Sequence, residues 1–219
     1  MPIPIETELT GFNGWILRTR PAGETPARLV VLVHGLTGDE NSMWVFARGL
    51  APSYHVLAPR APYAAEAGGY SWRPDPDGDL GQPAMQTLTA SVDALLGLVD
   101  AYAASVNLSA GQFDLVGFSQ GAALASLVAL MHPDRVRKVG MLAGFVPRGA
   151  EGLAAGMPLS GKSIFVAHGT LDTMVPVERA RASIRLLEQA GAEVIYCEEE
   201  VGHKVSAGCL RALHSYLAS

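Results

Sequence analysis

Residues 113–125 of this chain read FDLVGFSQGAALA, an apolar run followed by a serine between two spaced glycines and then by small residues. The apolar run is typical of a buried β-strand, and the alanines after Gly121 favour a closely packed helix. Because Gly117 and Gly121 lack side chains, strand and helix can approach at a sharp turn that leaves the Ser119 hydroxyl exposed. The pattern predicts a nucleophile at Ser119, with an ordinary tight strand-to-helix turn as the alternative.

Alternating strands and helices extend in both directions from this turn. Most of the expected strands are continuously apolar, as in a parallel sheet that helices cover on both faces. The predicted strands are residues 28–33, 54–58, 113–118, 136–142, 163–168 and 192–198, and the predicted helices are residues 42–50, 83–105, 120–132, 177–190 and 206–217. The sequence therefore predicts an α/β protein with a mostly parallel central sheet.

The domain organisation is predicted to be simple. Gly11–Gly14 separates residues 3–9 from residues 15–19, so we expect a leading antiparallel hairpin. The segment Gly144–Lys162 is too short for a helical cap domain. With no internal repeat, low-complexity tract or interdomain linker, residues 1–219 are expected to form a single domain.

Composition excludes several classes of protein. Hydrophobic residues make up 49% of the chain and charged residues 17%, which is typical of a folded globular protein and not of a disordered one. A formal net charge of -5 without a Lys/Arg cluster argues against nucleic acid as a partner. The longest apolar helical stretch is too short to span a bilayer, and residues 1–6 lack the features of a secretory signal. We therefore expect a soluble, cytoplasmic protein.

The two cysteines, Cys197 and Cys209, fall in a predicted strand and the last predicted helix. Neither a Cys-x-x-Cys motif nor metal-ligand spacing surrounds them. We expect both to be reduced and structural.

The loop after the first central strand is the candidate oxyanion loop. It reads HGLTG, from His34 to Gly38. A loop at this place supplies one backbone N–H to a developing oxyanion, and the residue after the nucleophile supplies a second. These donors are predicted to be Leu36 and Gln120. Both act through the main chain, so their side chains should be less constrained than the glycines that permit the path of the loop. His34 is interpreted as a structural imidazole.

Asp172 and His203 are the candidate partners of Ser119. Asp172 is the first carboxylate after the strand at residues 163–168, and His203 follows the next strand. The carboxyl ends of parallel strands are where ligand-facing loops gather, and Ser, Asp, His is the order that such a sheet uses. His203 is the predicted general base and acid, and Asp172 is predicted to orient it. A turn-forming Asp172 and a polar His203 preceding a helix are the structural alternatives.

Taken together, these motifs resemble the phospholipase/carboxylesterase family of small α/β-hydrolases, which includes acyl-protein thioesterases and bacterial carboxylesterases. The segments that carry the resemblance are residues 34–38, 59–62, 71–72, 117–121, 168–172 and 202–203. The resemblance implies an α/β-hydrolase fold, a triad of Ser119, Asp172 and His203, oxyanion donors at Leu36 and Gln120, and no cofactor or metal. It also implies hydrolysis of small-molecule carboxylic esters or thioesters.

The long connection Arg60–Gln82 is the candidate substrate loop. It carries Tyr63, Tyr70 and Trp72 among glycines and prolines, and long ordered loops often bind ligands. We predict that these aromatic residues line an acyl groove. The alternative is that Trp72 and Tyr70 only anchor the loop to the core.

Carboxylesterase activity is the favoured function. An acyl-thioesterase or a lysophospholipase would use the same triad, and a non-catalytic ligand-binding protein on the same fold is the remaining alternative. The sequence leaves the choice between monomer and homodimer open.

Overall fold

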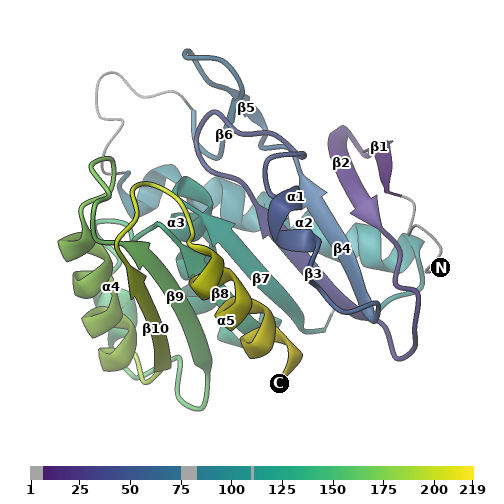
Figure 1. The fold of residues 1–219 in the computed structure, drawn as a ribbon. Helices are drawn as coiled ribbons and strands as arrows, with labels where there is room; N and C mark the ends of the chain where they lie inside the picture. The colour runs from purple at the N-terminus through teal and green to yellow at the C-terminus, as the bar shows by residue number, and fades with distance from the viewer. Residues whose placement is uncertain (1–6, 75–82, 110) are drawn as a thin grey trace.

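The structure, a computed structural model, describes residues 7–74, 83–109 and 111–219. Its centre is an eight-stranded sheet in the order β1-β2-β4-β3-β7-β8-β9-β10 (Figure 1). The six strands from β4 to β10 in this order are parallel, and the hairpin β1–β2 joins β4 antiparallel. The strands are β1 (Glu8–Phe12), β2 (Trp15–Arg20), β3 (Arg28–Val33), β4 (Tyr54–Pro59), β7 (Phe113–Phe118), β8 (Val136–Leu142), β9 (Ser163–Gly169) and β10 (Glu193–Glu199). A separate two-stranded sheet pairs β5 (Tyr63–Ala64) with β6 (Tyr70–Ser71).

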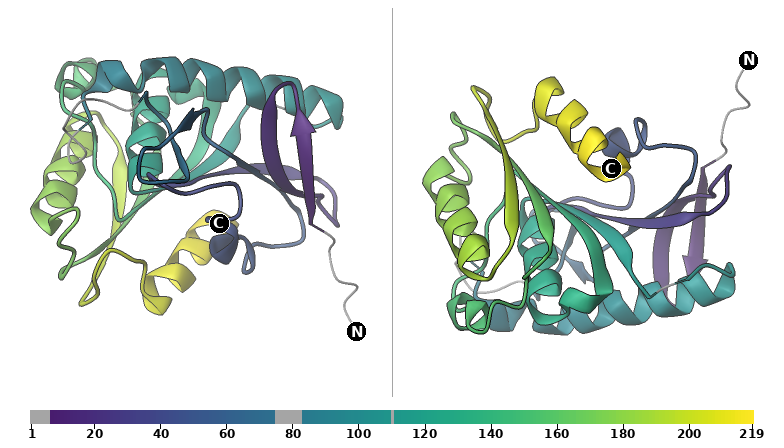
Figure 2. Two further views of the ribbon diagram at one scale, coloured as in Figure 1. Left: turned by 90° about the horizontal axis from the view of Figure 1, so that it is seen from above. Right: turned by 90° about the horizontal axis from the view of Figure 1, so that it is seen from below.

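Helices cover both faces of the large sheet, as the two views of Figure 2 show. One apolar cluster lies between the sheet and α2, α3 and α4, and a second lies between the sheet and α1 and α5. The α-helices are α1 (Trp44–Ala47), α2 (Thr89–Ser105), α3 (Gln120–Met131), α4 (Val177–Gln189) and α5 (Ala207–Ala218), and the 3-10 helices are η1 (Met85–Thr87), η2 (Pro133–Arg135) and η3 (Glu151–Ala154). Among the described residues, no helix combines the length and hydropathy that crossing a bilayer requires.

The predicted parallel sheet flanked by helices is confirmed. The bounds of β3, β7 and β8 coincide with those predicted, because most of the residues of each strand are apolar and buried. The connection from β8 to β9 contains only the four-residue η3, so no cap domain is inserted there. Parallel strands place their carboxyl ends at one edge of the sheet, and this edge carries the candidate site.

The leading hairpin is also present, and its turn begins two residues after the start of the predicted Gly11–Gly14 turn. Phe12 pairs with Trp15, so the turn consists of Asn13 and Gly14. Both have positive φ, 47° and 84°, the conformation of the two-residue turns that match the twist of paired strands. The predicted first strand begins in residues 1–6, which lie outside the described part of the chain.

The helix predicted over residues 42–50 is much shorter in the structure, where α1 is confined to Trp44–Ala47. Side chains from other elements take its terminal carbonyls. His214 Nε2 donates to Phe46 O at 3.0 Å, and Arg20 donates to Ala47 O at 2.9 Å. Gly49 packs so closely on His214 that a Cβ there would lie 2.1 Å from the ring. These tertiary contacts end the helix early.

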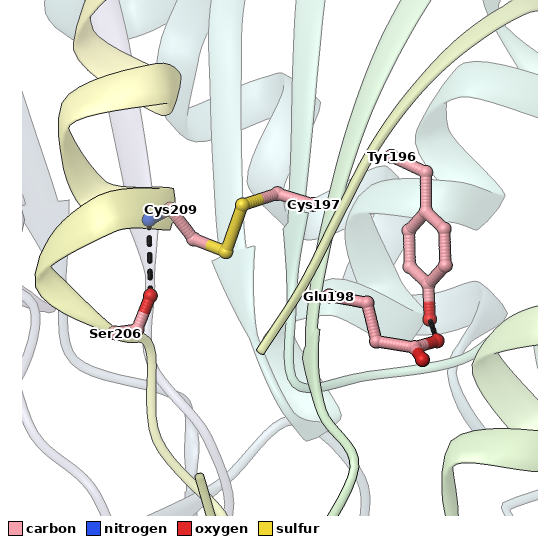
Figure 3. The surroundings of a disulfide bond; sticks show 5 residues. All are labelled: Tyr196, Cys197, Glu198, Ser206 and Cys209. Carbon is pink, nitrogen blue, oxygen red and sulfur yellow. Dashed lines mark hydrogen bonds between the residues drawn. A yellow bond between two sulfur atoms is a disulfide. The ribbon is translucent and has the colours of Figure 1, made fainter. Parts of the chain in front are cut away.

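The expectation that Cys197 and Cys209 are reduced is wrong. A disulfide joins them, linking β10 to the first turn of α5 (Figure 3). The Cα atoms lie 5.6 Å apart although the residues are 12 positions apart in the chain. No local motif announces this pairing, because it arises only when α5 folds back over one face of the sheet.

Candidate active site

Ser119 lies at the sharp turn between β7 and α3. Its backbone has φ 53°, a value that non-glycine residues rarely adopt, and its N–H donates to Leu142 O at 2.8 Å. A Cβ at Gly117 would lie 2.1 Å from Gly121 O, and one at Gly121 would lie 2.2 Å from Val33 O. The two glycines are therefore required by the close approach of strand and helix. The turn holds Ser119 at the floor of a cavity.

His203 and Asp172 come together from neighbouring loops, after β10 and β9 respectively. His203 Nδ1 donates to Asp172 Oδ2 at 2.7 Å. The other carboxylate oxygen, Oδ1, accepts from the backbone N–H groups of Met174 and Val175, both at 2.9 Å. Asp172 is buried, so these bonds replace the water that a carboxylate otherwise requires. They fix the orientation of the carboxylate, and the carboxylate fixes the imidazole.

His168 is a neighbour of this pair to which sequence analysis gave no role. Its Nε2 donates to Val175 O at 2.8 Å and lies 3.4 Å from Asp172 Oδ2. Both side chains are fully buried, and His168 Nδ1 has no hydrogen-bond partner among the described residues. His168 thus supports the turn that holds Asp172. Its position four residues before Asp172, at the end of a strand, was the available signal.

Leu36 and Gln120 both line the cavity that contains Ser119. Within the described residues, neither of their backbone N–H groups has a hydrogen-bond acceptor. The loop that carries Leu36 is held by Tyr70, whose carbonyl accepts from Thr37 N at 2.9 Å and whose N–H donates to Gly38 O at 3.0 Å. A rigid loop with a free N–H is what an oxyanion donor needs.

His34 is buried beneath this loop. Its Nδ1 donates to Gly35 O at 2.7 Å, and its Nε2 accepts from Ala61 N at 3.0 Å. Burial lowers the pKa of His34, which keeps the ring neutral and able to make both bonds. The interpretation of His34 as a structural imidazole is confirmed.

The cavity beside Ser119 has a volume of about 850 Å³. His203 and Lys204 are the only titratable side chains among the described residues that line it. Apolar side chains form most of the remaining wall, from α1 and the residue before it, the end of β7, α5 and the loops after β8, β9 and β10: Met43, Val45, Phe46, Phe118, Phe145, Met174, Val175, Val205 and Leu210. Sequence analysis missed these residues because they come from several separate segments. The cavity suits an apolar substrate with little charge.

The three aromatic residues predicted to line an acyl groove lie elsewhere. Trp72 is 0% exposed, and its indole N–H donates to His34 O at 2.8 Å. Tyr70 packs against the Arg60 guanidinium, 4.5 Å from the ring centroid, and its hydroxyl accepts from Arg60 at 3.0 Å. Neither these two nor Tyr63 is among the residues that line the cavity. The alternative, in which Trp72 and Tyr70 anchor the loop, fits this placement. Residues 75–82 of the predicted loop lie outside the described residues.

Arg60 and the buried Glu40 brace the same loop. Two Arg60 nitrogens donate to the Glu40 carboxylate, at 2.7 and 2.9 Å. These bonds hold the pKa of Glu40 below its usual range, so Glu40 remains ionised. The ion pair connects the oxyanion loop to the residues after β4.

The side chain of Gln120 is more constrained than expected. It is buried, its Oε1 accepts from Trp72 N at 2.9 Å, and its Nε2 donates to Ser71 Oγ at 3.1 Å. The sequence prediction for Gln120 considered only its backbone N–H and assigned no partner to its side chain. The side chain instead ties α3 to Ser71 at the end of β6 and to Trp72, the residue that follows it.

Gln120→Ala is expected to lower the free energy of unfolding by about 1–3 kcal/mol, because Trp72 N–H loses its acceptor inside the protein. Turnover should fall much less than in an oxyanion-hole knockout, which costs about 10²-fold or more, since the backbone N–H remains. Chemical denaturation and kcat on a soluble ester would measure both effects. Gln189→Ala, at an exposed position at the end of α4, is the matched control. A loss of kcat of oxyanion-hole size at unchanged stability would contradict this division of roles.

The mostly parallel sheet, the serine at a strand-to-helix turn and the polar residues at the carboxyl ends of β9 and β10 define an α/β-hydrolase. The family model described as Phospholipase/Carboxylesterase matches residues 16–219, and the chain therefore belongs to that family. This makes it a carboxylic ester hydrolase.

Relatives of known structure agree on the fold. The crystal structure of a carboxylesterase from Mesorhizobium loti is similar with a TM-score of 0.82 and 24% identity, covering 97% of this chain and 99% of the other. The Bacillus cereus carboxylesterase gives a TM-score of 0.83 at 22% identity, covering 94% of each chain. Carboxylesterase SOBER1 from Arabidopsis thaliana is 30% identical over 109 residues, which cover 47% of this chain and 46% of that protein.

Proposed function

We propose that this chain is a serine carboxylesterase in which Ser119, His203 and Asp172 form the catalytic triad. The observation that carries the proposal is that His203 lines the same cavity as Ser119 while its Nδ1 donates to the buried Asp172 at 2.7 Å. This bond leaves Nε2 as the ring nitrogen available to take a proton. A buried carboxylate of fixed orientation is what the resulting imidazolium requires.

The proposed reaction proceeds through an acyl-enzyme. Ser119 Oγ attacks the carbonyl carbon of the ester as His203 Nε2 takes the hydroxyl proton. The negative charge on the carbonyl oxygen is stabilised by the N–H groups of Leu36 and Gln120. His203 then returns the proton to the alcohol as the C–O bond breaks. Water, activated by the same imidazole, releases the acid and restores Ser119.

Covalent labelling with a fluorophosphonate probe tests this proposal. We expect labelling at Ser119, located by peptide mass spectrometry, together with turnover of p-nitrophenyl esters. A protein that only binds ligands in this cavity would not be labelled. Acyl-thioesters and lysophospholipids belong in the same panel, since an acyl-thioesterase or a lysophospholipase would use the same groups and differ in kcat/KM.

Rates should rise with acyl-chain length and then level off. Each methylene buried in the apolar cavity is worth about 0.8 kcal/mol, and the gain stops where the cavity ends. With no cap domain, no sharp rise is expected when the substrate forms micelles. Measuring kcat/KM for acyl chains from acetate to palmitate, below and above that threshold, checks both points. A jump at the threshold would contradict an open site.

Met174 offers a matched test of the cavity wall, because Met174 lines the cavity and Met157 does not, although both are exposed. Met174→Ala should reduce kcat/KM for the longer esters by about 4- to 15-fold, roughly the worth of one or two buried methylenes. Met157→Ala should leave it unchanged.

A cytoplasmic location stays a prediction. The cytosol keeps most thiols reduced, so the Cys197–Cys209 disulfide bears directly on it. Acid quenching of cells followed by alkylation and mass spectrometry would show whether the pair is oxidised where the protein resides.

A further inference from the structure

The Cys197–Cys209 disulfide joins the two ends of the segment that carries His203. Cys197 belongs to β10 and Cys209 to the first turn of α5, as Figure 3 shows. His203 lies midway, six residues from each cysteine. The disulfide therefore closes a loop with the proposed general base at its centre.

The first half of this loop is well held by backbone hydrogen bonds. Glu199 O accepts from Thr170 N at 2.9 Å, and Val201 O accepts from Leu171 N at 3.0 Å. A Cβ at Gly169 would lie 2.1 Å from Val201 O, so the two backbones are in direct contact. These bonds tie residues 199–201 to the loop that presents Asp172.

The second half, residues 202–206, makes few backbone hydrogen bonds to the rest of the protein. Its backbone hydrogen bonds, within the described residues, are Lys204 N to Gly202 O at 2.7 Å and the bond that Leu210 N donates to Ser206 O at 2.9 Å. Ser206 Oγ also accepts from Cys209 N at 3.0 Å. Two of these three bonds anchor the segment to the start of α5. The position of the His203 backbone thus depends on where α5 begins.

We infer that the Cys197–Cys209 disulfide is a positioning link for His203, so that reducing it lowers turnover while the fold remains intact. This rests on the proposed function, in which His203 must reach Ser119 and Asp172 together. Cleaving the link removes the covalent tie between β10 and the first turn of α5, so the far end of residues 202–206 is then held only by the packing and hydrogen bonds of α5. A displacement of about 1 Å is enough to cost a catalytic group up to 10²-fold.

The reduction itself is an ordinary thiol–disulfide exchange with a dithiol. A thiolate of the reagent attacks the sulfur of Cys197, which is partly buried, and the sulfur of the buried Cys209 leaves. The second thiol of the reagent then displaces Cys197. Two cysteine thiols and one oxidised, disulfide-containing reagent result, so two electrons and two protons are transferred to the protein.

The test compares native enzyme, dithiol-reduced enzyme and the variants Cys197→Ala, Cys209→Ala and the double variant. Reduction should lower kcat on a soluble p-nitrophenyl ester by about 10-fold, with KM unchanged. Each single variant and the double variant should show this same loss, because each removes the same bond, and none should respond to dithiol. Reoxidation should restore the native enzyme. Amide hydrogen exchange should accelerate in residues 202–206 and in the first turn of α5, and not elsewhere.

Two controls separate positioning from general stability. Leu213→Val removes packing from the buried face of α5 and should lower Tm without lowering kcat. A chelator is included throughout, since ligand atoms of Cys197, Glu199 and Cys209 lie within 4.8 Å of one another and the freed thiols could capture a metal.

The inference is overturned if the reduced enzyme keeps its native kcat and its native exchange in residues 202–206 while only Tm falls. The comparison of native and reduced enzyme does not depend on whether any cysteine variant folds. If native enzyme hydrolyses no ester, the proposed function fails, and hydrogen exchange still decides whether the disulfide holds this segment. Active enzyme that is insensitive to reduction defeats the inference alone.

Discussion

Ser119→Ala is expected to lower kcat by about 10⁴-fold or more, because no acyl-enzyme can form without the hydroxyl. Alanine has the same Cβ as serine, so the turn at φ 53° should be as well tolerated as it is in the native protein. The residual rate would come from the oxyanion donors and from substrate binding. Fluorophosphonate labelling should disappear together with turnover.

Ser126→Ala is the matched control for this experiment. Ser126 is buried in α3, two turns from Ser119, and its hydroxyl donates to Ala123 O at 2.7 Å. It does not line the cavity. The control should keep its label and its rate. A Ser119→Ala enzyme that turns over esters at nearly the native rate would refute the assignment of the nucleophile.

Asp172→Asn should reduce kcat by about 10⁴-fold, as expected when the imidazole is held in the wrong tautomer. The asparagine oxygen can keep the two bonds from Met174 N and Val175 N. Its amide nitrogen then faces His203 Nδ1 as a donor, which favours the tautomer with the proton on Nε2. That nitrogen can no longer accept the proton of Ser119. The measurement is kcat on a soluble ester, with circular dichroism to show that the fold is kept.

Asp100→Asn is the control variant, because it makes the same substitution at an exposed carboxylate that pairs with an arginine. Asp100 lies on α2, is half exposed and pairs with Arg135. An exposed ion pair contributes little, about 0–1 kcal/mol, so both rate and fold should be nearly native. Normal turnover in Asp172→Asn would remove Asp172 from the triad, and Glu200 would then be the next carboxylate to replace.

The backbone around Ser119 was predictable from sequence because its determinants are local. Gly117 and Gly121 permit a close approach that a Cβ would prevent, and the apolar run before them encodes a strand buried on both faces. The same reasoning placed β3 and β8 at their observed bounds. Asp172 and His203 were selected because each follows a predicted strand, and parallel strands end at one edge of the sheet.

Side-chain partners far apart in the sequence were decided by the tertiary structure. Trp72 resembled a groove residue because it lies in a long loop, but the loop folds inward and its indole donates to His34 O. Gln120 was expected to act through its backbone alone, whereas its side chain meets Ser71 and Trp72 some 48 residues away.

The sequence by itself determined the order of strands and helices, the turn at Ser119 and the loops that carry Asp172 and His203, since hydrophobic period and glycine placement act over a few residues. Only the tertiary structure decided the early end of α1, the apolar wall of the cavity and the Cys197–Cys209 disulfide. Each of these depends in part on α5 lying over one face of the sheet beside α1. That placement is set by packing between distant segments, which no local pattern specifies.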